Sequence, residues 1–369
     1  RRRGVRRRGH SRPQMLAQVV FPGVLPRDPV AQPLAFRDWP GATGEARREE
    51  RDSPLHNITN SSLAADAEHR YPARWLRHNT REALDASRHQ AKVWEQEVRE
   101  AARHAWQGYR ARAWGHDQLH PQRGEPDDWF HLGLNIVEVL DTLWLMGMVE
   151  EFDEAALWVE ESLNFSEAHT KLDSFFEATI RLLGGLLGAH SLSQRPIFLT
   201  RARELGDRLI SAWPEGAALP NAQVDIGKNF SQHVKWRGNT WSTAEVGTCQ
   251  LEFRYLSRHT QDPTYATFAD RAFNAILDAT PNKGLISINL AGNLKPVEQG
   301  STISLGAHGD SYYEYLLKQY LQTSQTEPRL RERWELAIRE MMDRLVHTSK
   351  DGYLYVAKEN DGKLVHEFD

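Results

Sequence analysis

The chain has 369 residues, of which 40% are hydrophobic and 26% are charged, and its formal net charge at pH 7 is −4. That composition is typical of a soluble globular protein and lacks the strong positive charge with which most nucleic-acid-binding domains attract phosphate, so no nucleic-acid partner is expected. A single cysteine excludes an internal disulfide, and no stretch reaches the roughly 18 apolar residues that a membrane-spanning helix needs.

The first part of the chain shows little periodicity. Residues 1–84 are rich in Arg, Pro, Asp and Ser, which predicts a disordered or stem-like segment ahead of an ordered domain at 85–369. The basic run at 1–8 suits a position beside an anionic membrane surface or a missing anchor helix, and equally a disordered arm. Four Asn-x-Ser/Thr sequons favour the secretory lumen and leave open whether they are glycosylated; they begin at Asn57, Asn60, Asn164 and Asn229.

The ordered domain is predicted to be a series of helices, because apolar residues recur at helical spacing between loops with Pro, Gly and Asn. One kind of helix is amphipathic, with Trp94, Val98 and Tyr109 on one face, as in an outer layer. The other kind is apolar nearly all round, as Phe176 and Leu186 illustrate. Their alternation predicts an all-α fold, a ring of helical hairpins with inner and outer helices. The expected helices are 88–114, 130–148, 151–163, 174–192, 196–213, 241–259, 263–279, 310–323 and 328–347.

Two β-hairpins are predicted at the rim of this ring. The first has a strand at 285–290 followed by a turn at 291–293, and the second has a strand at 353–356 followed by a turn at 360–362. Neither is expected to contribute to the central layer.

Four inner helices begin with a Ser or Asn followed three residues later by Glu. In a capping box the first side chain accepts from the amide of the third helical residue, so every one of these acids has a purely structural explanation. A functional explanation is compatible with it, because inner helices that run parallel bring their N-terminal acids to one mouth. The pairs are Asn135 and Glu138, Ser174 and Glu177, Ser242 and Glu245, and Ser311 and Glu314.

The helix at 174–192 carries the strongest indication of a functional site. Glu177, Arg181, Gly184 and Gly188 share one face, so a carboxylate and a guanidinium are followed by two residues without side chains and room is expected beside them. The alternative is a structural ion pair with glycines for close helix packing. Asp310, one residue before Ser311, is either a helix cap or a further acid of the mouth. Paired carboxylates suit glycoside hydrolysis, in which one protonates the leaving oxygen while another acts on the opposite face of the sugar.

Other chemistries have little support in the sequence. Cys249, on an apolar helix, is interpreted as a small core residue and not as a nucleophile. The 16 histidines show no HExxH or comparable metal-ligand spacing. His116 and Asp117, after a Trp-Gly turn, are expected to hold that loop.

Six ordered segments between residues 104 and 318 form a specific combination. They are HAWQGY at 104–109, AWGHD at 113–117, VLDTL at 139–143, FEATIRLLGGLL at 176–187, QLEFRYLSR at 250–258 and GDSYYEYLLK at 309–318.

From about residue 92 to the end, the chain resembles glycoside hydrolase family 47, the class I α-1,2-mannosidases, most closely the endoplasmic-reticulum type and in a fungal-like form. The resemblance implies an (α/α)7 barrel and calcium-dependent, inverting removal of α-1,2-linked mannose from high-mannose N-glycans. It implies that Glu177 and Asp310 belong to the catalytic set and that Arg181, Glu245 and the residue at His308 line the sugar site. It also implies a monomer in the lumen of the endoplasmic reticulum or Golgi, possessing a type II membrane anchor.

Three positions depart from the family pattern. His308 stands where an Arg linked to branch preference is usual, so the branch is left open; Glu138 replaces Asp, and Cys249 replaces a small or aliphatic residue. The family's general-base Glu, its Ca²⁺-binding Thr-Glu and its disulfide cysteines have no counterpart up to Asp369. Residues 1–369 by themselves are therefore expected to be inactive. A mannose-binding degradation factor without efficient trimming and a helical scaffold with capping acids are the alternative functions.

Overall fold

A computed structural model of the protein describes residues 81–167, 172–234, 240–292, 294 and 301–366. The chain divides into two units, Arg1–Arg37 and Asp38–Asp369. The first unit lies outside the described residues, as do the basic run at 1–8, the sequons at Asn57 and Asn60, and almost all of the predicted stem. No described helix is both long and apolar enough to cross a membrane.

The described residues confirm the predicted series of helices and shift most boundaries by a few residues. In chain order they are α4 (Arg81–Ala113), α5 (Leu134–Leu145), α6 (Val149–Glu161), α7 (Phe175–Glu177), a π-helical segment η4 (Ala178–Leu183), α8 (Gly184–Ser193), α9 (Pro196–Leu209), α10 (Thr243–Val246), α11 (Gln250–Thr260), α12 (Thr264–Ala279), α13 (Asp310–Gln322) and α14 (Pro328–Arg344), with short 3₁₀ turns η3 (Phe165–Glu167) and η5 (Ile210–Ala212).

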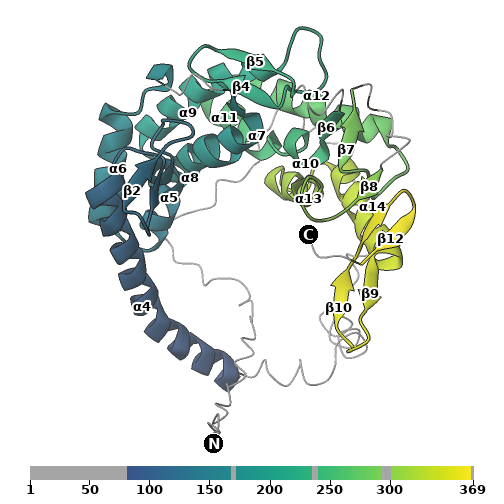
Figure 1. The fold of residues 1–369 in the computed structure, drawn as a ribbon, viewed down its shortest axis with the longest axis horizontal. Helices are drawn as coiled ribbons and strands as arrows, with labels where there is room; N and C mark the ends of the chain where they lie inside the picture. The colour runs from purple at the N-terminus through teal and green to yellow at the C-terminus, as the bar shows by residue number, and fades with distance from the viewer. Residues whose placement is uncertain (1–80, 168–171, 235–239, 293, 295–300, 367–369) are drawn as a thin grey trace, which may run out of the picture. The chain divides into compact units, whose positions relative to one another are not determined.

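Inner and outer helices alternate as the sequence predicts. α5, α8, α11 and α13 contact one another in that order, and each packs against the outer helix that follows it, α6, α9, α12 or α14 (Figure 1). Leu182 and Leu186 are fully buried, in agreement with an inner helix that is apolar on most sides. Only part of the predicted apolar face of α4 is buried: Tyr109 is buried, whereas Trp94 and Val98 are more than half exposed.

The strands form small antiparallel sheets beside the helices. β1 (Gln118–His120) pairs with β2 (Glu125–Asp127), and β4 (Gln223–Asp225) lies between β3 (Asp173–Ser174) and β5 (Phe230–Gln232). β6 (Thr240–Ser242) pairs with β7 (Asn289–Ala291), and β9 (Val346–Thr348) pairs with β10 (Leu354–Val356). β11 (Lys358–Asn360) lies between β8 (Thr302–Ile303) and β12 (Lys363–Val365).

Most of the residues after the turn of the first predicted hairpin lie outside the described residues, and the Ile288 amide donates to the Thr302 carbonyl beyond that turn at 2.8 Å. The strand near 285–290 is β7, and it pairs with β6, which lies almost fifty residues earlier, with Ser242 opposite Asn289. The Thr243 amide also donates to the Ile288 carbonyl, at 3.0 Å. In the second predicted hairpin, the strand at 353–356 is β10, which pairs with β9. The predicted turn at 360–362 instead joins β11 to β12. The long-range pairing of β7 with β6 at the start of an inner helix is therefore a contact that local turn signals do not predict.

Two predicted helices are interrupted. The helix at 174–192 contains η4, a π-helical segment, and such segments occur often at functional sites. The helix at 241–259 breaks into α10 and α11 at Gly247, where an added Cβ would lie 2.9 Å from the Thr243 carbonyl oxygen and 3.0 Å from Tyr312. Gly247 thus allows the α10 backbone to approach α13 closely.

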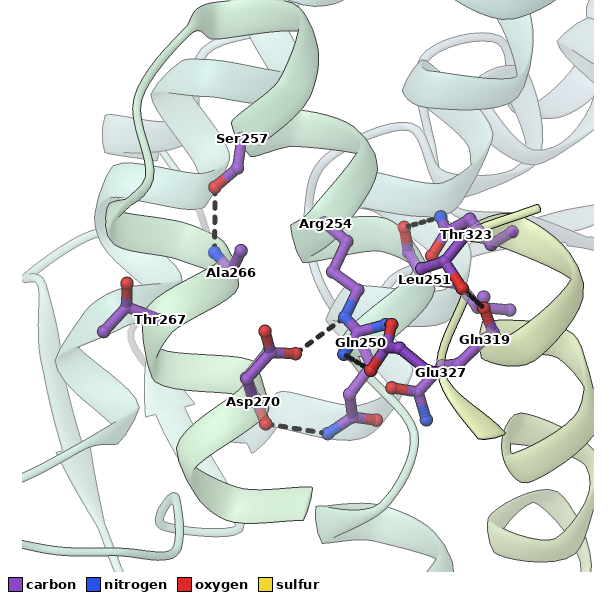
Figure 2. Close-up of polar contacts among 12 residues, drawn as sticks. Gln250, Leu251, Arg254, Ser257, Ala266, Thr267, Asp270, Gln319, Thr323 and Glu327 are labelled. Atoms are coloured by element: carbon purple, nitrogen blue, oxygen red, sulfur yellow. Dashed lines mark hydrogen bonds and ion pairs between the residues drawn. The ribbon is translucent and has the colours of Figure 1, made fainter. Parts of the chain in front are cut away.

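A buried arginine joins three helical elements in the core (Figure 2). The Arg254 side chain on α11 is only 8% exposed, and its Nε donates to Asp270 of α12 at 2.7 Å. Its two terminal nitrogens donate to Glu327, just before α14, at 2.7 and 3.1 Å. This pairing ties the α11–α12 hairpin to the start of the next outer helix.

Arg254→Ala is expected to lower the free energy of unfolding by about 3–5 kcal/mol, because it leaves partly buried carboxylates without their cation. Chemical denaturation followed by circular dichroism measures the change. Arg329→Ala is the matched control: this α14 side chain is half exposed and pairs with Asp278 at the surface, so a loss of at most about 1 kcal/mol is expected. Equal losses in the two variants would contradict a special contribution of Arg254.

Candidate active site

Arg181 joins two of the predicted acids. From η4 its Nε donates to Glu177 of α7 at 2.5 Å, and its Nη1 donates to Glu138 of α5 at 2.7 Å. The Arg181 side chain keeps 36% of its surface exposed and Glu177 keeps 29%, so the cluster is open to solvent on one side. Two carboxylates and one guanidinium from neighbouring inner elements therefore meet at a reachable position.

Trp129 forms an aromatic surface beside this cluster. The Arg181 guanidinium carbon lies 5.6 Å from the centre of the Trp129 ring, and 38% of the Trp129 surface is exposed. Arg181 therefore contacts a π-face as well as two acids.

The loop that carries Trp129 is held by Asp117. This carboxylate is 1% exposed and accepts from five backbone amides: Oδ2 from residues 129, 130 and 131, and Oδ1 from residues 132 and 134, at 2.5 to 3.0 Å. His116 Nδ1 lies 2.6 Å from Asp128 Oδ2, and the Asp117 amide donates to the other oxygen of Asp128. The prediction that His116 and Asp117 hold their loop is confirmed.

The capping boxes divide into two groups. Ser174 and Ser242 are the N-caps of α7 and α10, and each hydroxyl accepts from the amide of the Glu three residues later, at 3.2 and 3.3 Å. Strands β3 and β6 end on these serines and deliver them in extended conformation, which an N-cap requires.

The capping boxes predicted at Asn135 and Ser311 do not form. The N-caps of α5 and α13 are Gly133 and Gly309, neither of which makes a side-chain cap. Gly133 adopts a left-handed φ of 61°, and the Asp117 interactions fix the start of α5, so Asn135 lies inside the helix. Ser311 instead receives a hydrogen bond at 2.8 Å from the Thr248 hydroxyl. Asp310 is the first helical residue and not the N-cap.

His308 and Glu245 lie at the start of α10, and this helix contacts both α7 and α13, the helix that begins at Asp310. Asp310 is exposed, and its Oδ1 accepts from the Ser311 amide at 2.8 Å. His308 has a left-handed φ of 69°, places Nδ1 3.3 Å from the Ser242 hydroxyl, and accepts from the Ala244 amide. Glu245 is partly buried in the first turn of α10. The helices of Glu177, Glu245 and Asp310 are thus neighbours in space.

The glycine face of α8 does not border empty space. A Cβ added to Gly184 would lie 3.9 Å from Glu252 Cγ on α11, and one added to Gly188 would lie 3.6 Å from Asp141 Oδ2 on α5. The expected room is therefore filled by two more acids, which the sequence reasoning missed. Both lie inside the motifs VLDTL and QLEF, but neither occupies a capping position, which is the pattern that predicts acids at the mouth.

Glu252 has an environment unlike that of the other acids. Its Oε1 accepts from the Tyr315 hydroxyl of α13 at 2.7 Å, while its Oε2 is shielded from solvent with no hydrogen-bond partner among the described groups. Burial is the main cause that raises the Glu252 pKa to about 7, and Tyr315 and Lys318 oppose the shift. Burial, reinforced by Glu252, also raises the pKa of Tyr315. Below neutral pH, Glu252 is therefore mainly the neutral carboxylic acid.

Glu252→Gln is expected to remove a pH dependence of stability. Because the folded pKa is raised, the contribution of Glu252 to folding is fully present below its unfolded pKa and is lost as pH rises toward about 7. At pH 8 the free energy of unfolding of the variant should be about 3 kcal/mol higher than that of the wild type. Near pH 4 the two free energies should be equal. Chemical denaturation across this range measures the difference, with Glu95→Gln on the exposed part of α4 as control. A constant difference between wild type and variant would refute the assignment.

Two further expectations concern metal and thiol chemistry. Cys249 is fully buried, and burial raises the pKa of its thiol, so it is a core residue and not a nucleophile. Within the part of the chain that the structure describes, no three His, Cys, Asp or Glu side chains are grouped to hold a metal ion.

Comparisons with known proteins converge on one family. The profile of glycosyl hydrolase family 47 matches residues 101–369. The endoplasmic reticulum mannosyl-oligosaccharide 1,2-alpha-mannosidase of Rattus norvegicus is 38% identical over 271 residues, 73% of this chain and 40% of that protein. Its Schizosaccharomyces pombe namesake is 39% identical over 269 residues, 71% of this chain and 50% of that protein. The chain therefore spans about half the length, or less, of these curated relatives.

A solved structure agrees with the sequence comparisons. The alpha-1,2-mannosidase from Trichoderma reesei matches with a TM-score of 0.67 and 26% sequence identity, over 74% of this chain and 60% of that one. The helical hairpins described above are thus those of a known fold, the (α/α)7 barrel.

Proposed function

Because the chain belongs to glycosyl hydrolase family 47, we propose that the protein hydrolyses terminal α-1,2-linked mannose of high-mannose N-glycans with inversion. The observation that carries the proposal is the Arg181 cluster, in which Arg181 pairs with Glu138 and Glu177 and lies over the exposed aromatic ring of Trp129. Carboxylates and an aromatic face are the groups with which proteins bind and cleave sugars. The names of the relatives support the linkage.

In this proposal the two catalytic acids come from different inner helices. Glu177 and Asp310 form the catalytic set, while Arg181, Glu245 and His308 contact the sugar. An inverting enzyme protonates the leaving oxygen with one carboxyl group and activates water on the opposite ring face with another, and the two lie roughly 6.5–9.5 Å apart. Arg181 fixes the Glu177 carboxylate by a charge-assisted hydrogen bond and so limits the orientations in which it meets a substrate oxygen.

Calcium, compartment and assembly are further parts of the proposal. Among the described residues no three His, Cys, Asp or Glu side chains are grouped to hold a metal ion, and the calcium ligands are expected elsewhere in the protein. The relatives named for the endoplasmic reticulum support action in its lumen. We further propose a type II membrane anchor and a monomeric state, with N-glycans of glycoproteins as the macromolecular partner.

The test is linkage-selective release of mannose. The full-length product of the gene is incubated with a high-mannose N-glycan and with mannobioses linked α-1,2, α-1,3 and α-1,6, with and without a calcium chelator. The proposal predicts mannose release from the glycan and the α-1,2 disaccharide only, and loss of release with the chelator. Equal cleavage of all linkages, or tight glycan binding without release, would contradict it.

A further inference from the structure

Two sequons that are far apart in the sequence lie at the same surface hollow. Asn164, after α6, and Asn229, in the turn between β4 and β5, both line a depression of about 560 Å³ whose other walls include charged side chains of α9. Both asparagines are exposed. The fold therefore presents two potential carbohydrate acceptors on one face.

Arg208 of α9 holds the two acceptor segments together. Its Nη2 donates at 2.9 Å to the hydroxyl of Ser166, the third residue of the first sequon. Its Nη1 donates to the carbonyls of Ile226 and Gly227 at 2.8 and 3.1 Å, which fixes the turn that carries Asn229. One guanidinium thus sets the position of both sites.

The backbone presents Asn229 outward. Its φ is 56°, in the left-handed region that Asn adopts more readily than most residues, and it lies at the tip of the β4–β5 hairpin. Asn164 lies in the segment between α6 and η3, where its Oδ1 accepts from the Ser166 amide at 3.0 Å. A sugar attached to either side chain would extend away from the core.

We propose that Asn164 and Asn229 carry N-linked glycans. The carboxamide nitrogen forms a bond to C1 of an oligosaccharide donated by a lipid diphosphate. The bond from C1 to the diphosphate oxygen breaks, the lipid diphosphate leaves with the electron pair, and a proton from the carboxamide passes to a base of the transferase. The modification rests on the luminal compartment in the proposed function, since the donor and its transferase belong to that compartment.

The structure also assigns an order to the two additions. A sequon needs the hydroxyl of its third residue. The Ser231 hydroxyl is partly buried in the folded chain, donates to the Ser211 carbonyl and accepts from Asn221 at 3.0 Å. The Ser166 hydroxyl accepts a hydrogen bond from Arg208, but its side chain stays exposed in the folded chain. Asn229 is therefore modified before β5 closes onto η5, whereas Asn164 stays available on the folded chain.

The experiment translates the full chain behind an added cleavable leader with microsomal membranes, in an Asn57→Gln/Asn60→Gln background. Two endoglycosidase-sensitive mobility steps are expected. Asn164→Asp and Asn229→Asp should each remove one step, and Asp is chosen because it also tolerates the left-handed conformation. Asn274→Asp, at an exposed α12 asparagine outside any sequon, should keep both. An unchanged pattern in either sequon variant would overturn the assignment of that asparagine.

A second arm tests the order. Folded, unglycosylated chain is incubated with purified transferase and lipid-linked oligosaccharide, and only the step at Asn164 is expected. Modification of Asn229 under these conditions, or of neither site, would overturn the assigned order. Because the added leader replaces native targeting and the readout is not mannose release, a negative result here and a failure of the proposed hydrolysis are distinguishable.

Discussion

Glu177→Gln in the full-length protein is expected to lower kcat for mannose release about 100- to 10,000-fold, the usual contribution of a positioned acid or base. Gln has nearly the same size and can still accept the hydrogen bond from Arg181 Nε, but it cannot donate or take up a proton at the substrate oxygen. The helix start should persist, because the Ser174 cap contacts the backbone amide of residue 177 and not its side chain.

A kinetic comparison on a high-mannose glycan measures this effect, with kcat and KM determined separately. Glu154→Gln is the matched control: this outer-helix acid on α6 pairs with Arg110 of α4, and its variant should keep the wild-type kcat. If Glu177→Gln trims at the wild-type rate, the role of the Glu177 side chain is limited to its ion pair with Arg181. That outcome would favour the scaffold explanation of the acids.

Asp117→Ala is expected to cost more than about 5 kcal/mol of folding stability, which is an exceptional value for a single substitution. It would leave five backbone amides at the start of α5 without their acceptor, and each buried donor that loses its partner costs about 1–3 kcal/mol. Trp129 lies on the same loop, so the surface beside Arg181 would be disturbed as well.

Chemical denaturation measures the loss, and Asp127→Ala on the exposed strand β2 should leave the free energy of unfolding nearly unchanged. Asp117→Asn provides a second measurement if the alanine variant does not accumulate. The Asn side chain keeps one carbonyl oxygen, which can still accept from one of the two groups of backbone amides. Asp117→Asn should therefore be destabilised less than Asp117→Ala. A loss below about 1 kcal/mol for Asp117→Ala would show that the loop is held by other contacts.

The fold could be predicted from the sequence where the spacing of apolar residues indicates which side of a helix is buried. Helices α8 and α12 follow the apolar spacing of their own residues, because a helix side that lacks charge has to be buried. The strand partners could not be predicted in this way. β6 and β7 are joined through contacts at Thr243 that no local turn signal reveals, since their sequence separation leaves many alternatives open.

The candidate site could be predicted only in part for a similar reason. A capping pattern is local, so it predicts the caps Ser174 and Ser242. The glycine caps of α5 and α13 depend instead on a distant carboxylate and on a tight approach of Gly309 to Ser304. Glu138 was expected as a capping acid, and its bond to Arg181 appears only in three dimensions. Glu252 was missed because its raised pKa results from packing against neighbouring helices.

The carboxylates around Arg181 are expected to serve an inverting α-1,2-mannosidase. Proton NMR of the anomeric region, recorded during hydrolysis of α-1,2-mannobiose by the full-length product of the gene, tests this expectation most directly. Inversion at C1 requires β-mannose to appear first and the α-anomer to follow by mutarotation. That order is expected for the wild-type protein, and no mannose signal is expected on the same timescale for Glu177→Gln. First appearance of α-mannose, or no release of mannose by the wild-type protein, would contradict it.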